Sequence, residues 1–301
     1  AVAAVAAGYC SLEYDTATGR RGERGAGVER WLQRLTGAEA ALCVNNGAAA
    51  LLLVVSALAA GRRVLVSRGE LVEIGGSFRI HEILERSGAE LVEVGTTNRT
   101  HLRDYERALE GRRDVAVLLR VHPSNFRVEG FTARPTLAEL AGLARRRRVA
   151  LVEDLGSGAL VDLAPLGVGH EPTVAESLAA GAEVVTCSGD KLLGGSQAGL
   201  VLGRRRLLAR VRRDPLARAV RMDKLALAAL EATLPLYAEP DRALREVPAL
   251  AMLGLGPAEL EARARRLAGA LAARVPGLRA TVVAGHGAVG GGSLPTRRLP
   301  G

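Results

Sequence analysis

Seven short apolar runs alternate with amphipathic segments through the first two hundred residues. Runs that are continuously apolar, rather than alternating, are typical of parallel strands buried on both faces of a sheet. Together with the helical patterns between them, they predict an open, doubly wound α/β sheet of about seven mostly parallel strands. The predicted strands are Ala40–Val44, Val64–Ser67, Leu91–Val94, Val115–Val121, Val149–Asp154, Glu183–Cys187 and Gly199–Leu202.

Helix-start and helix-stop signals support the same alternation. Thr136 and Thr173 each stand three residues before a glutamate, the T-x-x-E pattern of a capping box at a helix start. Gly37, Gly88 and Gly181 follow predicted helices, where a left-handed residue commonly ends a helix. These signals place the intervening helices between the predicted strands.

Beyond residue 215 the pattern changes. Leu216–Tyr237 reads as one long helix with Pro235 disturbing its last turn, and Pro257–Val275 reads as a second helix. Ala280–Ala284 is a candidate strand. We therefore predict a large catalytic domain in residues 1–215, followed by a connecting helix and part of a smaller C-terminal α/β domain in residues 216–301.

The composition is that of a globular protein, with 48% apolar and 24% charged residues and a net charge of +9. Cys10, Cys43 and Cys187 form no CxxC pair, which argues against a structural zinc site and for a reducing compartment, so we expect a cytoplasmic protein. The histidines show no metal-ligand spacing. No apolar run is long enough to predict a membrane span.

Lysine is nearly absent from the chain, since 39 of the 41 basic residues are arginine. One of the two lysines, Lys191, stands between a predicted strand and the pair Gly194-Gly195. Schiff-base chemistry requires a primary amine that can lose its proton, which arginine cannot supply. Lys191 is therefore a candidate nucleophile, although a solvated loop lysine is the alternative.

Two further segments fit a pyridoxal phosphate site. Asp154 ends a predicted strand and could face a pyridinium nitrogen, or could equally cap a helix or bind a metal. Asn46 and Gly47 follow another strand and open an apolar helix, whose first N–H groups favour an anion. An Asn-capped buried helix is the alternative. Together with Lys191 they favour the aspartate-aminotransferase fold, fold type I of pyridoxal phosphate enzymes.

Four longer strings closely resemble bacterial selenocysteine synthase, the L-seryl-tRNA(Sec) selenium transferase family. The resemblance extends from about Tyr9 to Tyr237. It is carried by Ser67–Ile80 (SRGELVEIGGSFRI), Val94–His101 (VGTTNRTH), Glu153–Gly158 (EDLGSG) and Ser188–Gly195 (SGDKLLGG).

The resemblance implies a pyridoxal phosphate site. Lys191 matches the lysine that holds the cofactor, and Asp154 matches the carboxylate beside the pyridine nitrogen. Asn46, Gly47 and Ser188 fall where the cofactor's phosphate is held. The implied reaction converts seryl-tRNA(Sec) to selenocysteyl-tRNA(Sec) by loss of the serine hydroxyl and addition of selenium from selenophosphate.

The resemblance also implies a second anion site and several partners. Arg218 and Arg221 match a pair implicated in gripping the phosphate of selenophosphate, for which planar guanidinium groups are well suited. The family forms rings of dimers, so a homo-oligomer is expected. The family's N-terminal tRNA-recognition domain and extreme C-terminus are missing, so we expect a fragment.

Other interpretations remain open at this point. A related fold type I enzyme could act on a small amino acid or amino-sugar phosphate as a lyase, and a non-catalytic RNA-binding remnant is a further alternative. The arginine runs 145–148, 204–206 and 212–213 could touch tRNA phosphates or complement helix dipoles, and no aromatic residues are interleaved with them. His122 could reach the site, and Lys224 has no assigned role.

Overall fold

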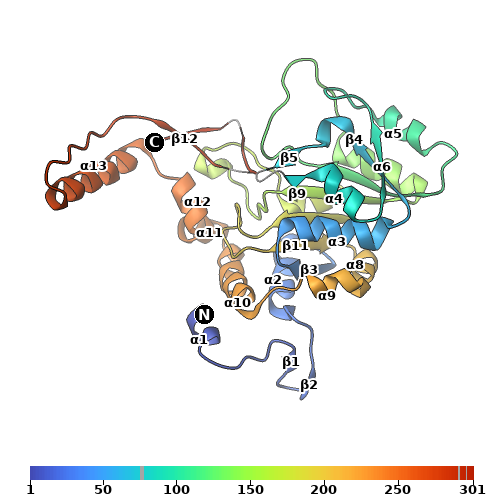
Figure 1. The fold of residues 1–301 in the computed structure, drawn as a ribbon, viewed down its shortest axis with the longest axis horizontal. Coiled ribbons are helices and arrows are strands. Elements are labelled where there is room, and N and C mark those ends of the chain that lie inside the picture. Colours follow the sequence, from blue (N-terminus) through green and yellow to red (C-terminus); the bar gives the residue numbers. More distant parts are fainter. Residues whose placement is uncertain (75–77, 291, 296) are drawn as a thin grey trace.

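A seven-stranded sheet forms the centre of the computed structural model, which describes residues 1–74, 78–290, 292–295 and 297–301 (Figure 1). Its strand order is β3-β11-β10-β9-β8-β4-β7, and β11 runs antiparallel to β3 and β10 while the other pairings are parallel. The α/β class and all seven predicted strands are confirmed, with ends shifted by at most two residues. The strands are β3 (Ala40–Val44), β4 (Arg63–Ser67), β7 (Glu90–Val94), β8 (Val115–Val121), β9 (Ala150–Gly156), β10 (Val184–Ser188) and β11 (Gly199–Gly203).

Successive residues of the central strands are buried on opposite faces, which is why these strands read as unbroken apolar runs. In β4, Val64 and Val66 enter the core beneath α3 (Gly47–Ala59), whereas Leu65 between them enters the core beneath α6 (Leu137–Arg147). All three side chains are fully buried. Helices therefore cover both faces of the sheet.

The helices divide between the two faces of the sheet and its β3 end. Helix α3 packs against α4 and α8 on one face, α5 packs against α6 on the other, and α2 contacts β3, α7 and α10. Both predicted capping boxes, at Thr136 and Thr173, are formed. The helices not yet delimited are α1 (Val2–Ala6), α2 (Ala26–Thr36), α4 (Ile80–Arg86), α5 (Leu102–Leu109), α7 (Val174–Ala179), α8 (Arg205–Arg213), α9 (Pro215–Ala219), α10 (Lys224–Thr233), α11 (Pro240–Glu246), α12 (Pro248–Leu253) and α13 (Pro257–Arg274), with 3-10 turns η1 (Arg68–Glu70), η2 (Ala164–Leu166) and η3 (Leu234–Ala238).

Three small antiparallel pairs lie outside the main sheet. Two of them flank parts of the candidate site, near the N-terminus and in the C-terminal segment. The third lies within the Ser67–Ile80 string, of which residues 75–77 lie outside the described part. The pairs are β1 (Tyr14–Asp15) with β2 (Arg20–Arg21), β5 (Glu73–Ile74) with β6 (Phe78–Arg79), and β12 (His286–Ala288) with β13 (Arg298–Pro300).

The prediction of one continuous helix over Leu216–Tyr237 is wrong. The chain leaves α9 and forms a β-bridge between Arg221 and Val44 before it enters α10. Asp223 then starts α10 afresh, because its side chain accepts hydrogen bonds from the N–H groups of Leu225 and Ala226. As expected from Pro235, the last turn is a 3-10 turn, η3.

The C-terminal region differs in packing on either side of about residue 255. Helix α10 and η3 bury Leu230 and Tyr237 in the same core as Leu32 of α2. Helix α13, by contrast, has no buried residue and extends away from the sheet (Figure 1). The strand predicted at Ala280–Ala284 is wrong, since that segment is irregular and the pairing begins at His286 in β12. The division into residues 1–215 and 216–301 stays a prediction.

Within the described residues, no helix has both the length and the apolar character needed to cross a membrane.

Candidate active site

Lys191 lies in a tightly held loop between β10 and β11. The Gly189 N–H donates to Ala198 O at 2.8 Å and the Gly194 N–H to Lys191 O at 2.9 Å. Gly194 has φ +65°, a left-handed conformation that glycine adopts without strain. Tyr237 Oη, reaching in from η3, donates to Leu193 O at 2.7 Å. The pair of glycines and this tyrosine therefore fix the path of the chain that carries the lysine.

The amine of Lys191 points toward two other segments of the chain. A Cβ placed on Gly156, which ends β9, would stand 3.8 Å from Lys191 Nζ and 3.6 Å from Ser124 Oγ. A Cβ on Gly292 would stand 2.5 Å from Nζ, so the C-terminal segment approaches the amine as closely as glycine permits. Sequence reasoning identified neither Gly292 nor Ser124, because both come from loops far from Lys191 in the chain.

Asp154 lies one strand away, paired in register with Thr186 of β10. Thr186 Oγ1 donates a hydrogen bond to Asp154 Oδ1 at 2.6 Å. Burial raises the pKa of Asp154, and this hydrogen bond together with the charges of Lys191 and His122 works in the opposite direction. The amine of Lys191 thus lies close enough for its charge to favour the ionised form of the Asp154 carboxyl.

An anion seat is formed where β3 leads into α3. Asn46 Oδ1 caps the helix by accepting the N–H of Ala49 at 2.8 Å, and the 13-residue helix directs its positive end toward this point. A Cβ on Gly47 would come within 2.6 Å of Ser188 Oγ, so only glycine leaves the gap between them open. Ser188 ends β10, three residues before Lys191.

These groups fit pyridoxal phosphate. The gap between Gly47 and Ser188 at a helix N-terminus suits a phosphate, and the amine of Lys191 and the carboxyl of Asp154 supply the two groups that a pyridine aldehyde needs. The structure therefore brings together five of the seven predicted site residues: Lys191, Asp154, Asn46, Gly47 and Ser188.

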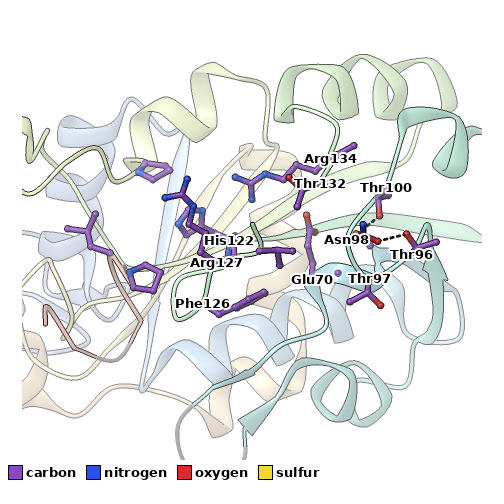
Figure 2. A pocket seen from close by; sticks show the side chains of 18 of the residues that line it. Glu70, Thr96, Thr97, Asn98, Thr100, His122, Phe126, Arg127, Thr132 and Arg134 are labelled. Carbon is purple, nitrogen blue, oxygen red and sulfur yellow. Dashed lines mark hydrogen bonds between the residues drawn. The ribbon is translucent and has the colours of Figure 1, made fainter. Parts of the chain in front are cut away.

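A cavity of about 480 Å³ adjoins this centre at the carboxyl ends of β4, β7 and β8 (Figure 2). His122 borders it, and the His122 N–H donates to the backbone oxygen of Asp154 at 2.9 Å, which joins the cavity to the centre. His122 Nε2 lies 3.5 Å from Oε1 of the buried Glu171. The cavity wall also holds Glu70, whose pKa is raised by burial although Arg120 lies 3.1 Å from its Oε1.

Arg218 and Arg221 line a different cavity, of about 460 Å³, which also contains Arg21, Arg24 and Glu13. Arg221 Nη1 lies 3.1 Å from Glu13 Oε1, and Arg24 Nε lies 2.8 Å from the same oxygen. Hydrogen bonds from Arg24 and Arg21, aided by the charge of Arg221, lower the pKa of Glu13 to about 2.

This arginine-lined cavity is linked to the anion seat through the backbone. Arg221 forms a β-bridge with Val44, and the Asn45 N–H donates to Val220 O at 2.9 Å. Arg221 therefore lies directly beside the start of α3, although Arg221 and Lys191 line two different cavities. The sequence alone did not indicate that Glu13 belongs to this cavity, because its ion-pair partner Arg221 lies 208 residues further along the chain.

Several arginines of the arginine runs form ion pairs within the chain. Arg204 pairs with Glu39, Arg206 with Glu183, and Arg212 with Glu29. Lys224, which had no assigned role, donates to Gly8 O at 2.9 Å and so ties α10 to the N-terminal segment. No group of three or more potential metal ligands occurs within the described part of the chain.

Comparison with known proteins extends over the whole chain. The profile of the L-seryl-tRNA selenium transferase family matches residues 1–301. L-seryl-tRNA(Sec) selenium transferases of Nitratidesulfovibrio vulgaris and Moorella thermoacetica are each 55% identical over the full chain, and that of Rhizobium meliloti is 51% identical over 96% of it. The chain spans 64%, 64% and 62% of these relatives' own lengths.

Solved structures confirm the predicted fold type. A D-glucosaminate-6-phosphate ammonia-lyase superposes with a TM-score of 0.67 at 18% identity, covering 99% of this chain and 72% of its own. A serine palmitoyltransferase from S. paucimobilis, solved with bound PLP, superposes with a TM-score of 0.54 at 16% identity, covering 87% of this chain and 60% of its own. At these identities the likeness concerns the fold alone.

Proposed function

The chain belongs to the L-seryl-tRNA selenium transferase family, and from that premise we propose that it forms the catalytic part of an enzyme that converts seryl-tRNA(Sec) to selenocysteyl-tRNA(Sec) with selenophosphate. Pyridoxal phosphate is the proposed cofactor. The observation that carries the proposal is the proximity of Lys191, in the loop after β10, to Asp154 of the neighbouring strand β9, beside an open anion seat at the N-terminus of α3.

The cofactor, when bound, supplies an electron sink for negative charge at the serine Cα. The residues of this chain would hold it at three points. Ser188 Oγ, Gly47 and the first N–H groups of α3 bind its phosphate, with Asn46 shaping the turn. Asp154 holds a proton at the pyridine nitrogen, and Thr186 fixes the orientation of that carboxyl group.

Lys191 is the proposed proton carrier as well as the point of covalent attachment. Once its amine is free, it removes the proton from the serine Cα and passes it to the β-hydroxyl, which leaves as water. The selenium of selenophosphate then adds to Cβ, Lys191 delivers a proton taken up from solvent to Cα, and water cleaves the Se–P bond so that phosphate is released. The loop held by Gly194 and Tyr237 keeps the amine at one place through both transfers.

Arg218 and Arg221 are proposed to hold the phosphate of selenophosphate. Their support is the arginine-lined cavity beside the start of α3, where guanidinium groups already gather around the carboxylate of Glu13. Planar guanidinium groups bind a tetrahedral oxyanion through paired, charge-assisted hydrogen bonds. The carboxylate of Glu13 at this point supports the proposal of an anion site.

The reaction itself tests the proposal. We expect selenocysteyl-tRNA when the enzyme, loaded with pyridoxal phosphate, receives both seryl-tRNA(Sec) and selenophosphate, and none when either is withheld. Acid urea gels or mass spectrometry of the hydrolysed aminoacyl group would measure it. Equal turnover of free serine, or ammonia release from an amino-sugar phosphate, would favour a lyase of the same fold instead.

We also propose a homo-oligomer in the cytoplasm, in keeping with the family. The exposed apolar side chains of Leu267 and Leu271 on α13 supply surface that an assembly could cover. Light scattering coupled to size exclusion would give the mass, and a monomer at micromolar concentration would contradict the proposed homo-oligomer. Fractionation of the source cells would test the cytoplasmic location.

A further inference from the structure

Two loops at the outer edge of the His122 cavity are joined into one platform. The loop after β7 contains Asn98 and Arg99, and the loop after β8 contains Phe131 and Ala133. Thr100 N–H donates to Ala133 O at 2.8 Å, and Ala133 N–H donates to Asn98 O at 3.1 Å. Asn98 Nδ2 also donates to Phe131 O at 2.7 Å. These hydrogen bonds hold both loops in place before any ligand arrives.

The platform presents an aromatic ring and a guanidinium group to solvent. Phe131 is 83% exposed, and the guanidinium carbon of Arg99 lies 6.0 Å from the centre of its ring. Arg99 Nε donates to Phe131 O at 3.2 Å, which fixes the guanidinium beside the ring. Aromatic residues make up only 3% of this chain, and an exposed ring beside a guanidinium group is a surface on which a base can stack.

The cavity behind the platform has the size and lining of a nucleoside site. Its volume of about 480 Å³ lies within the range of small-molecule pockets. Phe126 offers a second ring, Thr96, Thr97 and Asn98 offer hydroxyl and amide groups, and Arg127 and Arg134 offer positive charge (Figure 2). Its inner end is His122, which contacts the backbone of Asp154.

We propose that this cavity and platform bind the single-stranded 3′ end of an RNA, with the terminal nucleoside in the cavity and the preceding base stacked on Phe131. The inference rests on the proposed function, because the reacting serine is esterified to the ribose of that nucleoside. Single-stranded RNA is recognised by stacking on aromatic rings and guanidinium planes, with cations along its backbone. Phe131, Arg99, Arg127 and Arg134 supply that combination.

This surface differs from the arginine runs that charge alone suggested. Arg204, Arg206 and Arg212 are paired with glutamates and have no aromatic neighbour among the described contacts. Arg99 and Phe131 are 32 residues apart in sequence and meet only because two loops are joined. The aromatic interleaving missing from the arginine runs is thus present at the mouth of the cavity.

Fluorescence anisotropy with a labelled single-stranded RNA ending in CCA tests the proposal on the cofactor-loaded protein. We expect Phe131→Ala to weaken binding about tenfold or more, and Phe131→Tyr to retain it, since base stacking depends on the ring. Phe131 is exposed, so neither change should disturb the fold. Tyr9→Ala, at an aromatic side chain that is also fully exposed, is the matched control and should leave binding unchanged.

The charge is tested separately from the ring. Arg99→Gln should weaken binding and reduce its salt dependence, whereas Arg266→Gln on α13 should do neither. Binding that is unchanged by both Phe131→Ala and Arg99→Gln would overturn the proposal, as would equal affinity for a blunt RNA duplex. Visible absorbance of the bound cofactor in the same samples reports on the proposed function independently, so a failure of one is distinguishable from a failure of the other.

Discussion

The centre around Lys191 and the cavity around Arg221 are built in opposite ways. The first brings together side chains at the ends of adjacent strands, with the Asp154 carboxyl and Thr186 hydroxyl held 2.6 Å apart in an enclosed environment. The second is open to solvent and gathers Glu13 and Arg24 with Arg221, which lies 208 residues beyond Glu13 in the chain. The Lys191 centre depends on single groups that no neighbouring residue can replace, whereas the Arg221 cavity depends on several arginines of the same charge.

The two constructions lead to different expectations for mutation. Where one amine and one carboxyl each have a separate task, removal of either should have a large effect. Where several arginines share one anion, each contributes part of the binding and the loss of one is graded. Substitutions in both places therefore test whether the two regions differ as their structures indicate.

Lys191→Arg should have the largest effect. Arginine retains the positive charge and most of the length, but its guanidinium does not lose a proton and cannot form the covalent link. We expect complete loss of the visible absorbance band of lysine-bound cofactor and of selenium transfer. Lys224→Arg is the matched control, since Lys224 only donates to Gly8 O and arginine can do the same. A visible band that persists in Lys191→Arg would exclude Lys191 as the attachment point.

Asp154→Asn should come next. The amide retains the shape and can still accept the hydrogen bond from Thr186, but it cannot hold a proton at the pyridine nitrogen. We expect the cofactor to bind while the turnover number falls about 10²–10⁴-fold, the usual range for a lost proton-transfer group. Stopped-flow measurement of Cα proton exchange would show whether that step is slowed. Thr186→Val should reduce turnover less, because it removes only the group that orients the carboxyl.

The enclosed centre could be predicted from sequence for a physical reason. Lys191, Asp154 and Asn46 each lie at or just beyond the carboxyl end of an apolar strand, and parallel strands bring these ends to one edge of the sheet. Local pattern was therefore enough to group these three residues, whereas the place of Ser188 at the phosphate came from the family resemblance. The seven strands were predictable on the same ground, because burial on both faces leaves an unbroken apolar run.

The rest depends on contacts between distant segments. Glu13 with Arg221, Arg99 with Phe131, and Gly292 with Lys191 meet across loops whose paths no local pattern specifies. The continuous helix predicted over Leu216–Tyr237 failed for the same reason. Its residues have helical periodicity, but the bridge of Arg221 to Val44 and the cap at Asp223 override that propensity.

Arg221→Gln should have an intermediate effect. Arg221→Gln removes one charged hydrogen-bond donor to the phosphate of selenophosphate. The lost binding free energy should weaken the binding of selenophosphate about tenfold. We expect the KM for selenophosphate to rise while the KM for seryl-tRNA(Sec) is unchanged. Arg218→Gln, at an exposed position on α9, should raise the KM for selenophosphate less than Arg221→Gln does. Arg274→Gln, in the last turn of α13 and outside this cavity, is the control and should change neither KM. An equal rise in both KM values would mean that Arg221 supports the centre rather than the donor.

Glu13→Gln should have the smallest effect and the opposite sign. The carboxylate of Glu13 occupies Arg221 and Arg24, and with a pKa of about 2 it remains charged at any working pH. A donor phosphate that binds Arg221 must displace it or share its partners. Removing the charge should therefore lower the KM for selenophosphate a few-fold at constant turnover number.

The matched control for Glu13→Gln is Glu23→Gln, which removes one negative charge from the same cavity at a position 3.7 Å from Arg212. A fall in KM that is common to both variants would be an effect of net charge, and one confined to Glu13→Gln would assign it to the contact with Arg221. A rise in KM for Glu13→Gln would show instead that the carboxylate holds Arg221 in its binding orientation.

The ion pairs of Glu13 also predict a contribution to the free energy of unfolding that is fully present above about pH 4.5 and is lost as the pH falls toward 2, because the folded-state pKa lies below the unfolded one. Acid unfolding of Glu13→Gln should therefore lack that part of the pH dependence, while the open position of the carboxylate keeps the difference near neutral pH small.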